Sequence, residues 1–228
     1  KAAPAETNAL PTDMQVVGAV QRASTPATIV MGAAGTMPGE LHKIWDAAQG
    51  GYHMEYGFSC MGYEIAGGLG IKMAEPDRDV IVMVGDGSYM MMNSELATAV
   101  GMGVKITLVI TDNRGYGCIN RLQMGTGGAQ FNNLYAHSNV SPIAIDFAAH
   151  AASMGAKAHK VSSIAELETA LDAARAATET TVIVIDTDPY PTTGAGGYWW
   201  DVAVPEVSAR AEVNQARTAY EAALKERT

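Results

Sequence analysis

Short apolar runs alternate with helical patterns through the middle of the chain. The run 80–84 stops at the tripeptide GDG, and the run 104–110 stops just before Asp112 and Asn113. Between them, apolar residues recur near the helical period, which predicts a helix. Strand, helix and strand in this order build a parallel sheet. We therefore expect an α/β fold in which the strand ends meet at one edge, where the ligands of such sheets bind.

The same alternation extends on both sides of this unit. Further helices are predicted at 14–22 with Asp13 as the cap, at 39–48, 62–74, 119–122, 146–154 and 207–225, and after a capping box of Ser163 and Glu166; further strands are predicted at 28–31, 156–161 and 181–185. Together they predict a three-layer α/β/α domain with a mostly parallel sheet at residues 13–188.

Two flanking segments differ from this domain in composition. Residues 1–12 form a linker with Pro, Ala and Thr, and residues 189–228 form a tail that begins with Gly and aromatic residues. Trp199 and Trp200 adjoin each other in a turn-rich part of the tail. We expect this aromatic cluster to pack on the domain, on a partner subunit or on the substrate.

The strand ends carry polar residues that suit a hard cation. Asp86 offers a carboxylate and Asn113 an amide oxygen, and Mg²⁺ combines such ligands with phosphate and water. Gly85 and Gly87 permit a sharp turn and a close approach to phosphate. A GDG alone also fits an ordinary strand-ending turn, but a GDG after a strand with a strand-ending Asn at this spacing favours the metal site. The small-residue loop 32–36 is a second anion-binding candidate, although an ordinary tight turn explains it too.

Composition narrows the class of protein. The chain has 228 residues, of which 48% are hydrophobic and 17% charged, and its net charge is −9. The acidic balance makes nucleic acid and anionic membrane surfaces poor partners. No apolar run is long enough to span a bilayer, and no secretory leader is visible. Cys60 and Cys118 form no motif, so we expect a reduced, cytoplasmic setting. The start at Lys1 indicates a fragment, a processed product or one chain of a split enzyme.

Longer motifs carry a resemblance to a known family. The GDG…N pattern resembles the magnesium motif of thiamine-diphosphate enzymes. The chain resembles the pyrophosphate-binding domain of the acetolactate-synthase-like superfamily, and within it the trihydroxycyclohexanedione hydrolases of myo-inositol breakdown. The segments that carry this resemblance are AAGTMPGELHKIW, GGYHMEYGFSCMGYEIAGGLG, GDGSYMMMNSE, GCINRLQ and GGYWWDVAVPEVSAR. They cover nearly the whole chain and imply the thiamine-diphosphate-binding fold.

The resemblance implies roles for individual residues. Asp86, Asn113 and the Gly115 carbonyl would hold Mg²⁺ against the cofactor diphosphate, and Met61 would hold the cofactor in its bent, reactive form. Asp112 stands where many relatives have Asn, but the ligand is the second residue of that pair. The implied cofactor contacts are Gly35, Thr36, Ser59, Met61, Gly85, Asp86, Gly87, Ser88, Asn113, Gly115, Tyr116 and Gly117.

Other residues near the motifs can be interpreted either as functional or as structural. His53 and Glu55 precede Met61 and, by the resemblance, join it as candidate catalytic residues that border the substrate. Their simpler readings are a structural histidine and a solvated glutamate. Glu64 favours the dipole at the start of its helix. The methionines at 90–92 are expected to pack in the core.

The implied activity is the hydrolytic opening of 3D-(3,5/4)-trihydroxycyclohexane-1,2-dione to 5-deoxy-glucuronate. A decarboxylase or carboligase acting on a 2-oxo acid, and a non-catalytic cofactor-binding chain, stay as alternatives. In this family a Glu on a separate pyrimidine-binding domain activates the cofactor, and nothing in this chain resembles that domain. We therefore expect a missing domain or partner chain, a homodimer or homotetramer, and little activity of this chain alone.

Overall fold

The centre of the fold is a parallel sheet. The computed structural model describes residues 9–55, 57–139, 144–193 and 202–226. Within these residues lies a six-stranded sheet in the order β2-β1-β3-β4-β6-β5, and every strand pair is parallel. The strands are β1 (Thr28–Gly32), β2 (Tyr52–Met54), β3 (Asp79–Gly85), β4 (Thr107–Asp112), β5 (Lys157–Val161) and β6 (Thr181–Asp186).

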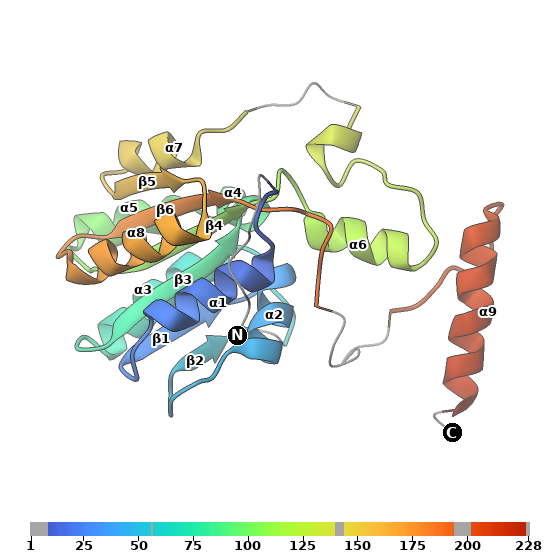
Figure 1. Cartoon of the computed structure of the whole chain (residues 1–228), viewed down its shortest axis with the longest axis horizontal. Coiled ribbons are helices and arrows are strands. Elements are labelled where there is room, and N and C mark those ends of the chain that lie inside the picture. The colour runs from blue at the N-terminus through green and yellow to red at the C-terminus, as the bar shows by residue number, and fades with distance from the viewer. Residues whose placement is uncertain (1–8, 56, 140–143, 194–201, 227–228) are drawn as a thin grey trace.

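Helices cover both faces of the sheet and give three layers (Figure 1). The helices are α1 (Asp13–Ala23), α2 (Thr36–Ile44), α3 (Tyr63–Ala74), α4 (Asp86–Met91), α5 (Ser94–Gly101), α6 (Gly117–Gly125), α7 (Phe147–Ser153), α8 (Ile164–Ala176) and α9 (Ala211–Glu226), with a 3₁₀ turn at Tyr135–His137.

Alternation along β3 explains the two cores between these layers. Val82 and Val84 point to the core beneath α3, α5 and α7, whereas Ile81 and Met83 point to the core beneath α1, α2 and α8. Both faces of the strand are buried, which is why its sequence is a continuous apolar run. The expected three-layer α/β/α architecture with a parallel sheet is therefore confirmed.

Two local features differ from the predicted elements. The cap of α1 is Thr12 rather than Asp13, since the Thr12 hydroxyl accepts the Gln15 N–H at 3.2 Å and the Gln15 side chain accepts the Thr12 N–H at 2.9 Å. Asp13 is thus the first residue of the helix. The short strand β2 is not predicted, because three residues after a glycine pair give too short a pattern to show a period.

Helix α3 lies unusually close to the sheet. A Cβ atom on Gly68 would lie 2.2 Å from Cγ2 of Val82 in β3, and one on Gly67 would lie 3.0 Å from Cε of Met31 in β1. Glycine weakens a helix by about 1 kcal/mol relative to alanine, so its presence here is explained by this contact. The close approach fixes the start of α3 beside the end of β3.

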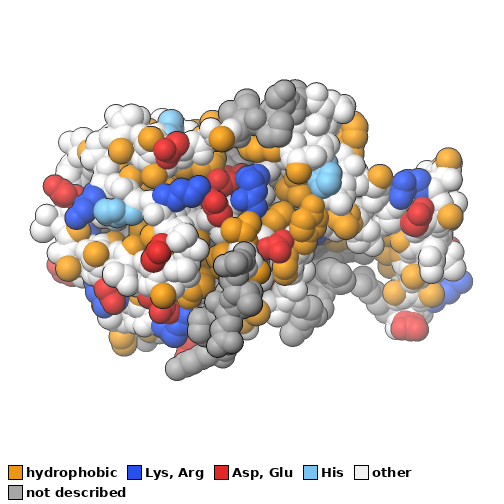
Figure 2. Space-filling view, turned by 45° about the horizontal axis from the view of Figure 1, so that its top comes forward, with side chains coloured by type: hydrophobic (Ala, Val, Ile, Leu, Met, Phe, Trp, Pro, Cys, Tyr) orange, Lys and Arg blue, Asp and Glu red, His pale blue; other side chains and the backbone are white. Residues whose placement is uncertain are grey.

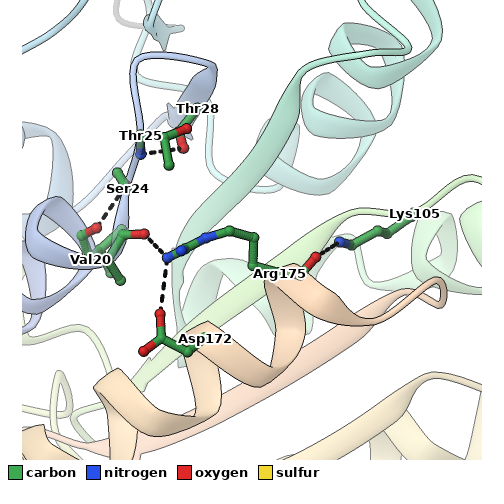
Figure 3. Close-up of polar contacts among 8 residues, drawn as sticks. Val20, Ser24, Thr25, Thr28, Lys105, Asp172 and Arg175 are labelled. Carbon is green, nitrogen blue, oxygen red and sulfur yellow. Dashed lines mark hydrogen bonds and ion pairs between the residues drawn. The ribbon is translucent and has the colours of Figure 1, made fainter.

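Polar contacts tie the helices together at the edge where the strands begin (Figure 3). Arg175 in α8 donates to the carbonyl of Ala23 at the end of α1, and it pairs with Asp172 at 3.1 Å. Lys105, just before β4, donates to the Arg175 carbonyl at 2.7 Å. These contacts hold α8 against α1 and the entry of β4, at the end of the sheet opposite to GDG.

The C-terminal part leaves the sheet and ends in a separate helix. After β6, the segment 188–193 reaches α2, where Thr193 donates its N–H to the Glu40 carboxylate at 2.9 Å and accepts from Lys43. Helix α9 stands apart from the three layers (Figure 1). Trp199 and Trp200 lie outside the described residues, as does their expected packing. In the part of the chain that the structure describes, no helix has the length and apolar character needed to cross a membrane.

Candidate functional site

A cavity lies where the central strands end. Its volume is about 610 Å³, and it opens beyond the carboxyl ends of β1, β3 and β4. All twelve residues that the resemblance assigns to the cofactor line it, although they come from four separate stretches of the chain. Whether they bind that cofactor stays a prediction. The further residues in the wall are Asp13, Ala34, Met37, Gly57, Phe58, Thr111, Cys118, Ile119 and Leu122.

Three buried side-chain oxygens in this wall, on Asp13, Asp86 and Asn113, have no hydrogen-bond partner among the described residues, and the last two lie at neighbouring strand ends. The neighbouring strands β3 and β4 bring Asp86 and Asn113 to the same edge, and their side chains are only 1% and 7% exposed. Asp86 Oδ2 accepts the Gly115 N–H at 2.7 Å. Asp86 Oδ1 and Asn113 Oδ1 accept no hydrogen bond from the described residues. Buried polar atoms normally find partners, and two unpaired oxygens at one sheet edge have the chemistry of ligands to a hard cation.

The charge of Asp86 supports the same reading. Burial, together with the neighbouring charge of Asp112, raises the pKa of Asp86 to about 7. The ionised carboxylate is unfavourable in this buried place, and a bound divalent cation would offset that cost in free energy. No group of three or more His, Cys, Asp or Glu suited to a metal occurs among the described residues. The candidate ligands at this place are the Asp86 carboxylate, the Asn113 amide oxygen and a backbone carbonyl.

Backbone geometry allows Gly115 to serve as that carbonyl. Its φ is +141°, and a Cβ atom there would lie 2.4 Å from the Asn133 carbonyl oxygen. Only glycine fits both conditions. A Cβ on Gly87 would lie 2.6 Å from the Tyr116 ring and 3.6 Å from the Gly115 carbonyl oxygen. The two glycines thus bring the GDG turn and the Gly115 carbonyl together.

The loop after β1 offers donors to an anion. Gly35 has a φ of +86° and turns the chain into α2, so that the N-terminal end of this helix meets the cavity at Thr36. The positive end of a helix dipole favours an anion there. Arg121 from α6 donates to the Thr36 hydroxyl oxygen and so brings a positive charge to this end of the helix.

Ser88 lies in the wall but points its hydroxyl elsewhere. The resemblance gives this hydroxyl to the diphosphate, whereas in the structure it donates to Glu64 Oε1 at 2.7 Å and accepts the Gly62 N–H at 2.8 Å. A contact of Ser88 with an anion would therefore come from its backbone N–H. The sequence alone gives no sign that Glu64 takes this hydrogen.

The mouth of the cavity is apolar and exposed. Ser59 and Met61 line it together with Phe58, which is 90% exposed. The methionines at 90–92 are 45 to 51% exposed, so the expectation that they pack in the core is wrong. Figure 2 shows apolar side chains gathered in the middle of the face between the sheet and α9. Such a patch is typical of a surface that another protein or a ligand covers.

His53 and Glu55 lie outside the cavity wall. His53 is in β2, and its Nε2 lies 3.2 Å from the Tyr63 hydroxyl, with the two rings stacked. Glu55 accepts the N–H of Cys60 at 2.6 Å and that of Phe58 at 3.3 Å, and these bonds lower its pKa. Both side chains organise the loop that leads to Met61. The geometry of this chain therefore does not support a catalytic role for His53 or for Glu55.

Asp13 is a wall residue that the sequence pattern presents only as a cap. It is 1% exposed, and its Oδ1 has no hydrogen-bond partner in the described part of the chain. Burial raises its pKa to about 6, although Arg121 and nearby hydroxyls act in the opposite direction. An acidic residue in the first turn of a helix is common, so the sequence carries no signal that distinguishes this one.

Comparisons with known proteins agree with this geometry. Residues 33–185 match the family model described as thiamine pyrophosphate enzyme, C-terminal TPP binding domain. The chain is 43% identical over 205 residues to a 3D-(3,5/4)-trihydroxycyclohexane-1,2-dione hydrolase of Bacillus cereus, which covers 86% of this chain and 32% of the relative. It is 43% identical over 213 residues to one of Bacillus anthracis, with 90% and 33% covered. The chain thus spans about a third of the length of these relatives.

Solved structures show the same fold at lower identity. A thiamine diphosphate-dependent 4-hydroxybenzoylformate decarboxylase of Rhodococcus jostii RHA1 superposes with a TM-score of 0.70 at 22% identity, over 82% of this chain and 34% of that one. A benzoylformate decarboxylase of Polynucleobacter necessarius gives 0.68 at 19% identity, over 78% and 33%. The fold, the cavity at the strand ends and the family match agree: this chain belongs to the family of C-terminal TPP-binding domains of thiamine pyrophosphate enzymes.

Proposed function

We propose that this chain binds the diphosphate of thiamine diphosphate through Mg²⁺ held by Asp86, Asn113 and the Gly115 carbonyl. The observation that carries the proposal is the pair of buried, unpartnered oxygens beside this carbonyl. The backbone N–H groups at Gly35 and Thr36 would face the phosphate oxygens. When bound, the cofactor supplies an electron-accepting ring for C–C bond cleavage. The task of the chain is then to orient the cofactor and neutralise its charge.

The similarity to trihydroxycyclohexanedione hydrolases supports a substrate class. At 43% identity over most of this chain, the full protein is proposed to be a hydrolase that opens 3D-(3,5/4)-trihydroxycyclohexane-1,2-dione to 5-deoxy-glucuronate. Met61 lines the cavity and is proposed to support the bent form of the cofactor. Water would have to enter between this chain and whatever covers the cavity mouth.

We further propose that a pyrimidine-binding domain covers the mouth. The chain spans about a third of its relatives, so most of such a protein is absent from it. The exposed apolar residues Phe58 and Ile119 in the cavity wall, with the exposed methionines at 90–92 after the GDG turn, offer a surface for that domain. If the domain comes from a second subunit, the active unit is at least a homodimer.

The metal assignment is tested on the complete protein. Thiamine diphosphate binding is measured by isothermal titration with Mg²⁺ and with a chelator, for the wild type, Asp86→Ala and Asp77→Ala. Asp77 is exposed in the turn before β3 and serves as the matched control. We expect Mg²⁺-dependent binding in the wild type and the control, and its loss in Asp86→Ala. Unchanged affinity in Asp86→Ala would refute the metal assignment.

The substrate is tested by following the cyclic dione and pyruvate side by side. With cofactor and Mg²⁺, we expect the complete protein to consume the dione and to leave pyruvate unchanged. Consumption of pyruvate alone would replace the hydrolase with a carboligase or decarboxylase. If neither the dione nor pyruvate is consumed although the cofactor is bound, the result would point to a non-catalytic chain or to another substrate.

A further inference from the structure

Glu64 is a buried carboxylate just behind the cavity wall. It lies in the first turn of α3, is 1% exposed, and is not among the residues that line the cavity. Its Oε1 accepts the Ser88 hydroxyl at 2.7 Å and the Ala34 N–H at 3.4 Å. Its Oε2 accepts the Gly62 N–H at 2.9 Å. One side chain therefore contacts three segments that are far apart in the sequence.

Each of these segments carries part of the cavity wall. Ala34 precedes Gly35 in the loop after β1, Gly62 follows Met61, and Ser88 follows the GDG turn. Gly62 has a φ of +93°, and its N–H is also accepted by Ser88 Oγ at 2.8 Å. The network is closed, because Glu64, Ser88 and Gly62 each contact the other two. A displacement of one segment must therefore disturb the others.

A simpler role for Glu64 would be to stabilise the start of α3 through the helix dipole. Such a role requires only a negative charge in the first turn and is worth about 0.3–1 kcal/mol at an exposed site. Glu64 is buried, and burial raises the pKa of its carboxyl, so a charge here would carry a desolvation cost that an exposed residue in a first turn does not have. All three donors point to its two oxygens. This arrangement uses the length and both oxygens of the side chain, not its charge alone.

We infer that Glu64 is a positioning residue that fixes the Met61–Gly62 turn, the GDG turn and the loop after β1 in one relative arrangement. The inference rests on the proposed cofactor function. In that function, Glu64 would keep three cofactor-facing segments in the binding geometry before the cofactor binds. Preorganisation of this kind lowers the free energy that binding must spend on ordering.

The test compares three variants of the complete protein. Glu64→Gln keeps the shape but turns one acceptor into a donor, and Glu64→Asp keeps the charge at the helix start but shortens the reach. Glu166→Gln is the matched control: Glu166 lies in the first turn of α8, accepts the N–H and hydroxyl of Ser162 at 2.8 Å, and is not among the residues that line the cavity. The measurements are thiamine diphosphate affinity at saturating Mg²⁺, and amide hydrogen exchange without cofactor.

We expect both Glu64 variants to bind thiamine diphosphate at least about tenfold more weakly. The same variants should exchange the amides of Ala34 and Gly62 faster, and Glu166→Gln should change neither property. If Glu64→Asp binds like the wild type, the charge alone suffices and the inference is overturned. Equal losses in Glu64→Gln and Glu166→Gln would overturn it too.

The two proposals fail in different ways. If the wild type itself does not bind thiamine diphosphate, the proposed function fails. The exchange measurement then still decides the role of Glu64, because it needs no cofactor. Unchanged exchange at both Ala34 and Gly62 in the Glu64 variants would show that the side chain does not hold these segments.

Discussion

Asp13→Asn is expected to stabilise the chain in a pH-dependent way. Asp13 is buried at the cavity wall, its Oδ1 has no partner among the described residues, and burial raises its pKa from the usual 3.8 to about 6. The charged form is therefore less favourable in the folded than in the unfolded chain. Asn has the same shape and no charge, so the substitution removes this penalty.

The magnitude follows from the two pKa values. Below pH 3.8 the carboxyl is protonated in both states and carries no penalty. Between 3.8 and about 6 the unfolded chain releases the proton before the folded chain does, so the free energy of unfolding falls as the pH rises. Above the folded value the full penalty of ~3 kcal/mol applies. We expect Asp13→Asn to gain about 3 kcal/mol at pH 7 and only about 0.5 kcal/mol at pH 4.

The assay is urea unfolding of the chain without cofactor, at pH 4, 5.5, 7 and 8. Asp77→Asn, at an exposed turn, gives the baseline for the loss of one surface charge. The difference between the two variants should grow through pH 4 to 6 and then level off. A gain that does not change with pH would refute the reasoning. A loss at pH 7 would show that Arg121 and the helix start stabilise the charge more than burial penalises it.

Two further substitutions test the cavity mouth and the packing of α3. Met61→Ala should lower the turnover of the complete protein by about tenfold or more while cofactor affinity changes little, since the side chain supports the bend rather than the anchor. Met73→Ala, exposed near the end of α3, is the control, and equal losses of turnover and affinity in Met61→Ala would contradict this role. Gly68→Ala should reduce stability by about 1–3 kcal/mol in thermal or urea unfolding, because its Cβ would meet Val82 at 2.2 Å. Gly70→Ala, with open space at its Cβ, should be neutral or stabilising, and similar effects of the two would argue against close packing as the cause.

The parts of the fold that follow from local sequence are the central strands and their helices. The apolar run of β3 and the GDG after it are both local, and so is the cap at Ser163, whereas the cap of α1 is Thr12 and not the predicted Asp13. The order of the strands is not local: β6 lies between β4 and β5, and no residue near Thr181–Asp186 marks it as an interior strand. Strand β2 escaped prediction because its partner β1, rather than its own pattern, holds it in the sheet.

The candidate site divides in the same way. Asp86 and Asn113 could be paired from the sequence, because parallel strands bring their ends to one edge. The hydrogen bond of Ser88 to Glu64 could not, since it joins residues on two helices and depends on how closely α3 approaches β3. The exposure of the methionines at 90–92 could not be predicted either, because it depends on whether another domain covers them. A helical pattern cannot distinguish a core face from a face that awaits another domain.

The strand order has a consequence for how the chain folds. Each strand of the sheet pairs with a strand from elsewhere in the sequence; Thr107 of β4 lies opposite Thr181 of β6, for example. Such non-local pairing makes folding slow, because long loops close before the contacts form. On the ribosome, the edge of β4 has no neighbour until β6 has been synthesised. During that interval an apolar strand edge is open to other chains, which makes the nascent protein a natural client for chaperones.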